Sequence, residues 1–249
     1  MGDPAALLQM KGILKSFGAV QALDGVDFEL YPNEILGLVG DNGAGKSTLI
    51  KIIAGVLMPD AGEIFLEGRR VHFRSPHHAR DLGIETVYQD LGLLDTLDVP
   101  KNIFIGREPR TAFFFYKMKE MIRRTKSILD SLHIEIPSTT REARLLSGGQ
   151  RQAIAVGRAA YWGHKIVILD EPTAALGVEE SMKVIELAKM LKSRNVSVIM
   201  ISHNLEHVFK VADRVIVLRK GKRVADRQIR DTSGDEIVRF ITGAEFANE

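Results

Sequence analysis

The sequence predicts an α/β fold with a mostly parallel sheet, an N-terminal antiparallel β region and an α-helical insert. Continuous apolar runs, such as residues 35–39 and 166–169, alternate with helical patterns, which is typical of parallel strands buried on both faces. Residues 7–14 and 26–30 alternate apolar and polar side chains instead, as strands of a partly exposed sheet do. Between residues 91 and 144 helical patterns replace strand patterns, so this stretch is expected to be an insert.

The composition indicates a globular chain without disulfides. Its 249 residues are 45% hydrophobic and 27% charged, and cysteine is absent, which excludes disulfides, thiolate catalysis and cysteine metal sites. A net charge of +2 gives no indication of a nucleic-acid surface. The longest apolar runs have strand length, and the first 14 residues lack the apolar core of a signal peptide. A partner would therefore have to hold this protein at a membrane.

Apolar runs bounded by turn residues predict the strands, and a period near 3.6 predicts the helices. Pro76 and Asp98 mark two helix starts, because proline suits the first turn and aspartate caps it. After the two exposed strands, the expected order is strand 34–39, helix 45–54, strand 63–66, helix 75–82, strand 84–88, helices 98–105, 118–132 and 150–161, strand 165–169, helix 179–194, strand 196–201, a short helix to 211, strands 214–218 and 222–226, and helix 234–242. The basic turn at 219–221 is expected to be solvated.

Two clusters allow both a structural and a functional interpretation. His72, His77 and His78 fit a solvated helix start better than a metal site, because no acidic or sulfur ligand lies among them. The aromatic run from Phe113 to Tyr116 either packs inside the insert or is exposed to bind a partner protein.

A glycine-rich loop between the strand at 34–39 and the helix at 45–54 fits the phosphate-binding pattern G-x-x-x-x-G-K-[ST]. Its glycines let backbone N–H groups point into one hollow, and the helix start adds positive charge. Lys46 is expected to reach the β- and γ-phosphates, and Ser47 to bind Mg²⁺. A turn without a ligand is the alternative, which the flanking strand and helix disfavour. The loop comprises Gly40, Asp41, Asn42, Gly43, Ala44, Gly45, Lys46, Ser47 and Thr48.

Asp170 and Glu171 directly follow the apolar run at 166–169. In a nucleotide site such an aspartate holds Mg²⁺ opposite Ser47, and the glutamate can act as general base toward the attacking water. A solvent-facing carboxylate pair fits less well in a chain that also carries a phosphate loop. The phosphate loop, Gln89, the carboxylates and His203 all follow predicted strands, where parallel sheets bind ligands. The sequence therefore predicts Mg²⁺-dependent ATP hydrolysis.

A second anion site is predicted at Ser147, Gly148 and Gly149, before the helix at 150–161. Ser147 is a natural N-cap, and the turn exposes backbone N–H groups to an anion. A chain with two half-sites can form two composite sites as a head-to-tail pair about a two-fold axis, with ATP between the copies.

Residues 146–150, Leu-Ser-Gly-Gly-Gln, resemble the signature of the ATP-binding-cassette (ABC) ATPases. The resemblance extends from Phe17 to His203 and implies a RecA-like P-loop NTPase core. It implies that Phe17 stacks on adenine, although a lone aromatic residue by itself would indicate core packing. It further implies that Gln89 reaches Mg²⁺ and the insert, that His203 contacts the γ-phosphate, and that the signature covers a partner's ATP. The signature contacts are Ser147, Gly148, Gly149 and Gln150.

The resemblance also implies a single nucleotide-binding domain over residues 1–249. Residues 1–90 and 151–249 would form the catalytic core with the antiparallel β region, and residues 91–150 the helical subdomain that ends in the signature. Gly177 stands where most of the family has aspartate, which leaves the contact between the two sites open.

Segments 75–84, 87–90 and 171–177 resemble the ATPases of bacterial monosaccharide importers of the fructose or ribose type. The resemblance implies an ATP-binding and ATP-hydrolysing subunit that energises sugar import, with ATP and Mg²⁺ as cofactors. The expected partners are a second copy, transmembrane permease subunits and, indirectly, a periplasmic sugar-binding protein, at the cytoplasmic face of the inner membrane. No nucleic acid is expected. One alternative is a transporter ATPase for another substrate. The other is a soluble ABC ATPase that acts on nucleic acid or ribosomes, and the near-neutral net charge argues against this second alternative.

Overall fold

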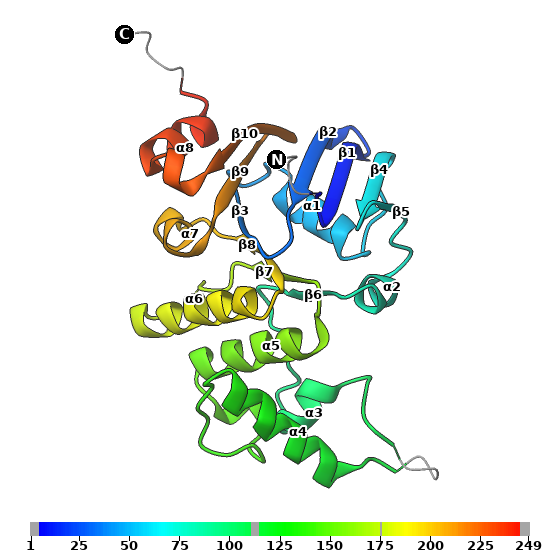
Figure 1. Ribbon diagram of the computed structural model, residues 1–249, viewed down its shortest axis with the longest axis vertical. Helices are drawn as coiled ribbons and strands as arrows, with labels where there is room; N and C mark the ends of the chain where they lie inside the picture. Colours follow the sequence, from blue (N-terminus) through cyan, green and yellow to red (C-terminus); the bar gives the residue numbers. More distant parts are fainter. Residues whose placement is uncertain (1–4, 111–114, 175, 245–249) are drawn as a thin grey trace.

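Two sheets form the centre of the computed structural model, which describes residues 5–110, 115–174 and 176–244 (Figure 1). The first sheet is antiparallel, in the order β2 (Val20–Leu30), β1 (Leu8–Phe17), β4 (Ala61–Leu66) and β5 (Arg69–Val71). The second has the order β10 (Lys222–Gln228), β9 (Arg214–Arg219), β3 (Ile35–Val39), β8 (Ser197–Ile201), β7 (Ile166–Asp170) and β6 (Ile84–Val87). It is parallel except for the edge pair of β10 with β9. The predicted α/β fold is confirmed.

Helices cover the parallel sheet. Asp98 caps one of them, as predicted, by accepting the N–H of Lys101, and Ser75, before the predicted start at Pro76, caps another by accepting the N–H of His78. In the described part of the chain, no helix has both the length and the apolar composition needed to cross a bilayer. The helices are α1 (Lys46–Ile53), α2 (Pro76–Asp81), α3 (Val99–Phe104), α4 (Met118–Ser131), α5 (Gly148–Trp162), α6 (Val178–Ser193), α7 (Leu205–Val211) and α8 (Gly234–Thr242), with 3₁₀ turns at Ala143–Leu145 and Ile229–Asp231.

The antiparallel sheet extends further than the sequence pattern predicts. Strands β1 and β2 continue to a tight hairpin in which Phe17 pairs with Val20, and β5 was not expected at all. The added residues mix polar side chains with exposed apolar ones such as Phe17 and Val20, so backbone pairing rather than apolar alternation defines them. In the aromatic run, residues 113 and 114 lie outside the described residues. Phe115 and Tyr116 are 75% and 53% exposed, so these two rings do not pack inside the insert.

Alternate residues of the central strands serve two separate cores. On β7, Ile166 and Ile168 join the core shared with α1 and the antiparallel sheet, whereas Val167 and Leu169 join the core shared with α5 and α6. That second core continues into α3 and α4, so the insert packs on the sheet through α5. The division into a core of 1–90 and 151–249 and a subdomain of 91–150 stays a prediction.

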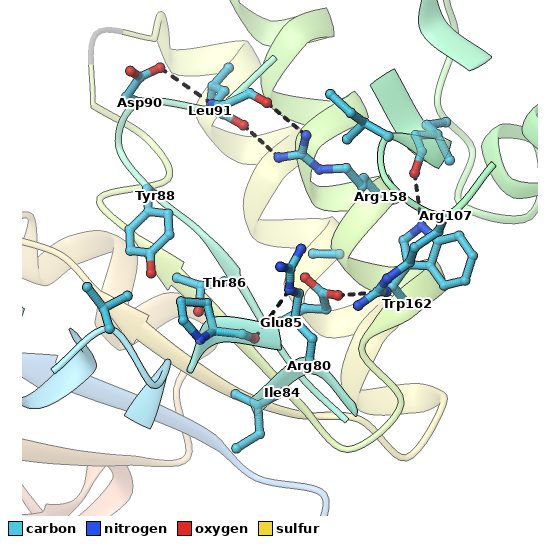
Figure 2. A pocket seen from close by; sticks show the side chains of 16 residues that line it. Arg80, Ile84, Glu85, Thr86, Tyr88, Asp90, Leu91, Arg107, Arg158 and Trp162 are labelled. Atoms are coloured by element: carbon cyan, nitrogen blue, oxygen red, sulfur yellow. Dashed lines mark hydrogen bonds and ion pairs between the residues drawn. The ribbon is translucent and has the colours of Figure 1, made fainter. Parts of the chain in front are cut away.

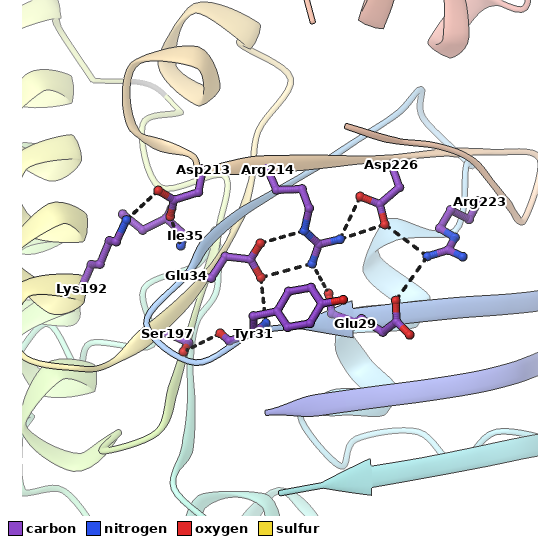
Figure 3. Close-up of polar contacts among 10 residues, drawn as sticks. All are labelled: Glu29, Tyr31, Glu34, Ile35, Lys192, Ser197, Asp213, Arg214, Arg223 and Asp226. Atoms are coloured by element: carbon purple, nitrogen blue, oxygen red, sulfur yellow. Dashed lines mark hydrogen bonds and ion pairs between the residues drawn. The ribbon is translucent and has the colours of Figure 1, made fainter. Parts of the chain in front are cut away.

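Arg214 on β9 joins the two sheets (Figure 3). Only 4% exposed, it donates to both carboxylate oxygens of Glu34 at 2.7 and 3.1 Å and to both oxygens of Asp226 at 2.8 Å. Its remaining N–H donates to the carbonyl of Glu29 on β2 at 2.6 Å. Burial alone would lower the pKa of Arg214, but the hydrogen bonds and charges of Glu34 and Asp226 outweigh it and raise the pKa. The guanidinium therefore stays charged between the sheets.

Arg214→Met should lower the free energy of unfolding by about 3 kcal/mol, because it leaves the buried carboxylate of Glu34 without its cation. Urea denaturation followed by circular dichroism measures this loss. Lys222→Met is the control, since it removes an exposed ion pair with Asp24 and should change stability by less than about 1 kcal/mol. Equal losses in the two variants would contradict the role assigned to Arg214.

Candidate active site

Four neighbouring strands bring the predicted site residues to one edge of the parallel sheet. Strands β6, β7, β8 and β3 lie side by side and run in the same direction. Gln89 follows β6, Asp170 ends β7, His203 follows β8, and the phosphate loop follows β3. Because parallel strands end at the same edge, the fold places these segments in one row.

The phosphate loop needs glycine at two positions because backbone passes close by. Gly40 has a φ of 147°, and a Cβ there would lie 2.1 Å from the carbonyl oxygen of Leu218. Gly45 has a φ of 104°, and its Cβ would lie 2.7 Å from the carbonyl oxygen of Ala22. The loop is thus fitted between β2 and the hairpin of β9 and β10. Its position against the start of α1 suits a bound phosphate.

The turn between β9 and β10 fastens this loop. Gly221 is buried, its N–H donates to the carbonyl of Ala44 at 3.1 Å, and its carbonyl accepts the N–H of Asp24 at 2.8 Å. The expectation of a solvated turn at 219–221 is therefore wrong for Gly221. The basic side chains of Arg219 and Lys220 dominate the sequence pattern, whereas the contact is made by backbone groups that no side-chain pattern reveals.

Lys46 lies across the phosphate loop. Its Nζ donates to the carbonyls of Gly40 at 2.6 Å and Asp41 at 3.0 Å. Burial lowers the pKa of Lys46, and the negative charges of Glu171, Asp41 and Asp170 oppose that shift. A single cation therefore serves both the loop and the carboxylates, which suits a group that neutralises phosphate oxygens.

Glu171 and His203 contact each other at the ends of β7 and β8. Nδ1 of His203 lies 2.7 Å from Oε2 of Glu171, and the backbone N–H of His203 donates to the same oxygen at 3.4 Å. The side chain of Glu171 is 17% exposed, whereas that of His203 is 75% exposed. Beside them, burial raises the pKa of Asp170, the charge of Glu171 raises it further, and Lys46 and Lys51 oppose the shift. The carboxylate pair is thus clustered, with one histidine orienting Glu171.

The possible Mg²⁺ ligands are oxygen donors. The described residues hold no cluster of three or more histidine, aspartate or glutamate side chains suited to a metal. Asp170, the hydroxyl of Ser47 and the amide oxygen of Gln89 would hold the ion together with phosphate oxygens, which fits the preference of Mg²⁺ for few protein ligands. The Mg²⁺ roles of these three residues stay predictions.

Phe17 lies at the tip of the β1–β2 hairpin and is 48% exposed, with Nζ of Lys15 5.7 Å from its ring centroid. The alternative of core packing therefore does not hold for Phe17, and its ring is accessible for stacking. Whether it stacks on adenine stays a prediction.

The signature turn lies apart from the phosphate loop of its own chain. The starts of α1 and α5 occupy different parts of the molecule in Figure 1. Ser147 caps α5 by accepting the N–H of Gln150 at 3.2 Å, and Oε1 of Gln150 accepts the N–H of Ser147 at 3.0 Å. This reciprocal capping engages the side chain of Gln150 within the fold, a role that the sequence analysis missed although the Ser-x-x-Gln spacing indicates it.

A cavity of about 390 Å³ adjoins Gln89, since Tyr88 and Asp90 line it (Figure 2). Arg158 of α5 donates to the carbonyls of Leu91 and Gly92 at 2.8 and 2.9 Å, which fixes the segment after Gln89. No sequence pattern marks Arg158, because its partners are backbone atoms 66 and 67 residues away in the chain.

The family model described as "ABC transporter" matches residues 23–174. The chain belongs to the ABC transporter family. This match includes the phosphate loop and Glu171, and the family assignment confirms the resemblance that the sequence indicated.

Two relatives of similar length are named as import ATP-binding proteins. The chain is 49% identical to the xylose/arabinose import ATP-binding protein XylG of Sulfolobus acidocaldarius, over 95% of this chain and 94% of that protein. It is 46% identical to the fructose import ATP-binding protein FrcA of Rhizobium meliloti, over 96% and 94%. A solved ATP-binding cassette of an ABC transporter superposes with a TM-score of 0.84 at 27% identity, over 95% of this chain and 98% of that one.

Asp170→Asn should raise the melting temperature at pH 7 without nucleotide and abolish Mg²⁺-dependent turnover. A carboxyl whose pKa is raised in the folded state destabilises the fold above that pKa, because ionisation is then less favourable folded than unfolded. The gain should shrink as the pH falls and Asp170 takes up its proton. Scanning calorimetry of this variant beside the exposed control Asp130→Asn measures the effect. A lower melting temperature for Asp170→Asn would contradict the raised pKa.

Proposed function

We propose that this chain is the ATP-hydrolysing subunit of a membrane importer for a monosaccharide. The observation that carries the proposal is Glu171 held against His203 in the same row as Asp170 and the phosphate loop. The named activities of the xylose/arabinose and fructose relatives support the class of substrate.

In this proposal the residues divide the chemistry among them. Lys46 and the loop N–H groups hold the β- and γ-phosphates, and bound Mg²⁺ supplies positive charge to the phosphate oxygens. Glu171 accepts a proton from water as the water oxygen bonds to the γ-phosphorus and the bond from that phosphorus to the β–γ bridging oxygen breaks, releasing ADP. His203 orients Glu171 and contacts the γ-phosphate, and Phe17 stacks on adenine.

A second copy would complete each site. The signature turn and the phosphate loop of one chain lie apart, and both are suited to phosphate. In a head-to-tail pair about a two-fold axis, Ser147, Gly148, Gly149 and the backbone of Gln150 would face the ATP held by the partner's loop. ATP then joins the two copies, and hydrolysis releases them.

Mixing two inactive variants tests this composite site. Lys46→Ala should not bind nucleotide, and Ser147→Arg should bind ATP without hydrolysing it. An equal mixture should recover about a quarter of the wild-type ATPase rate, because half of the pairs then contain one intact site of two. Each variant mixed with itself is the control. No recovery, in a mixture that size-exclusion chromatography shows to contain mixed pairs, would contradict shared sites.

The permease would dock at the cavity beside Gln89. Residues of α2, β6, α3 and α5 enclose it, and its wall combines the rings of Tyr88 and Trp162 with the ion pair of Glu85 and Arg107 at 2.9 Å (Figure 2). We propose a cytoplasmic helix of the permease as the occupant, because it would contact the segment that carries Gln89 and thus link substrate movement to the active site. This docking would hold the chain at the cytoplasmic face of the inner membrane, with a periplasmic sugar-binding protein acting through the permease.

Purification with its membrane partner tests the transport function. ATP hydrolysis by the complex with its binding protein should rise severalfold with one monosaccharide and not with amino acids.

Glu171→Gln should retain ATP binding, favour the ATP-bound pair and lower turnover by a factor of at least about 100, since it removes the general base. Glu179→Gln, an exposed glutamate on α6, is the matched control and should hydrolyse ATP normally. Co-purification with RNA or DNA instead of a membrane protein would overturn the proposed transport function. Normal turnover by Glu171→Gln would overturn the role of Glu171 as general base.

A further inference from the structure

The turn that carries Glu171 has a strained backbone. Glu171 has a φ of 50°, in the left-handed region that residues other than glycine rarely adopt. Its N–H donates to the carbonyl of Ile201 at 3.0 Å, and its carbonyl accepts the N–H of Ala174 at 3.1 Å. These bonds fix the backbone of the turn, and the side chain of Thr173 gives the turn a further contact, with α7.

Thr173 binds a histidine that the mechanism above does not use. Thr173 is 8% exposed, and its Oγ1 lies 3.0 Å from Nδ1 of His207 on α7. Asn204 caps this helix, since its Oδ1 accepts the N–H of His207 at 3.3 Å. Its Nδ2 then faces Nε2 of the His207 ring at 3.4 Å. An amide NH₂ group only donates, so Nε2 is the acceptor and Nδ1–H donates to Thr173.

His207 therefore connects two segments that each carry a site residue. Through Thr173 it contacts the turn of Glu171, and it lies on the helix that begins directly after His203 and Asn204. The same two segments also meet directly, because Oε2 of Glu171 and Nδ1 of His203 are 2.7 Å apart. We propose that His207 is a positioning residue, whose bond to Thr173 holds the carboxylate of Glu171 at its distance from His203. This inference rests on the proposed role of Glu171 as general base.

Paired substitutions separate this role from general stability. Thr173→Val removes the hydroxyl and keeps the shape. His207→Asn keeps a donor near the place of Nδ1, whereas His207→Gln moves its donor to the place of Nε2. Thr125→Val is the control, because Thr125 on α4 is also buried and its hydroxyl has no hydrogen-bond partner among the described residues.

Thr173→Val and His207→Gln should each lower kcat for ATP about tenfold with KM within about twofold, because a misplaced base slows chemistry without weakening binding. Their double variant should lose no more than either single variant, since both remove one contact. His207→Asn should keep most of the activity, although glutamine is the better helix former. Thr125→Val should match the wild type. The full-length chain is assayed in complex with its membrane partner.

A kcat for Thr173→Val within twofold of wild type would overturn the proposal, as would equal losses for His207→Asn and His207→Gln or multiplied losses in the double variant. Ring ¹⁵N NMR of the full chain gives a readout that needs no turnover. His207 should show a protonated Nδ1 that changes in Thr173→Val, and an unchanged spectrum would also overturn the proposal. Glu171→Gln is assayed in parallel. Normal turnover there would reject the general base, while the NMR result would still decide whether the bond exists.

Discussion

The buried guanidinium of Arg214 is the contact on which the arrangement of the two sheets depends. It binds Glu34 before β3, Asp226 on β10 and the carbonyl of Glu29 on β2, so one charged group fixes three strands from both sheets. The phosphate loop is fitted between the same two sheets, with backbone from each within a few ångströms of its glycines. A shift between the sheets would therefore deform the loop. The buried ion-pair network of Arg214 thus helps to maintain the geometry of the candidate site.

The candidate site concentrates features that oppose stability. The pKa of Asp170 is raised by burial and by Glu171, the pKa of Lys46 is lowered by burial, and Glu171 adopts a left-handed backbone. Each of these features is unfavourable by itself, and the surrounding fold maintains them together. Two partly buried carboxylates near Lys46 and Lys51 form an arrangement that a divalent cation and a polyphosphate would complement. A bound cation and polyphosphate would therefore offset the unfavourable electrostatics of these side chains.

Much of the fold could be predicted from the sequence, because apolar strands and helix caps are local signals. Even the row of Gln89, Asp170 and His203 follows from knowing that parallel strands end at one edge. The sequence could not indicate contacts made by backbone atoms or between distant segments. Gly221 reaches the phosphate loop through its N–H, and Arg158 reaches carbonyls 66 and 67 residues away. The extensions of β1 and β2 mix polar side chains with exposed apolar ones such as Phe17 and Val20, so their pairing partners define them rather than an apolar alternation.

The reciprocal bonds between Ser147 and Gln150 have a consequence for affinity. They set the shape of the signature turn within a single chain, before any second copy or nucleotide arrives. The turn therefore loses its conformational entropy when the chain folds, and association with a second copy does not include that loss. A preorganised turn can engage and release an anion repeatedly at little cost, so a clamp built on it would open and close with the state of the phosphate rather than with the refolding of its own surface.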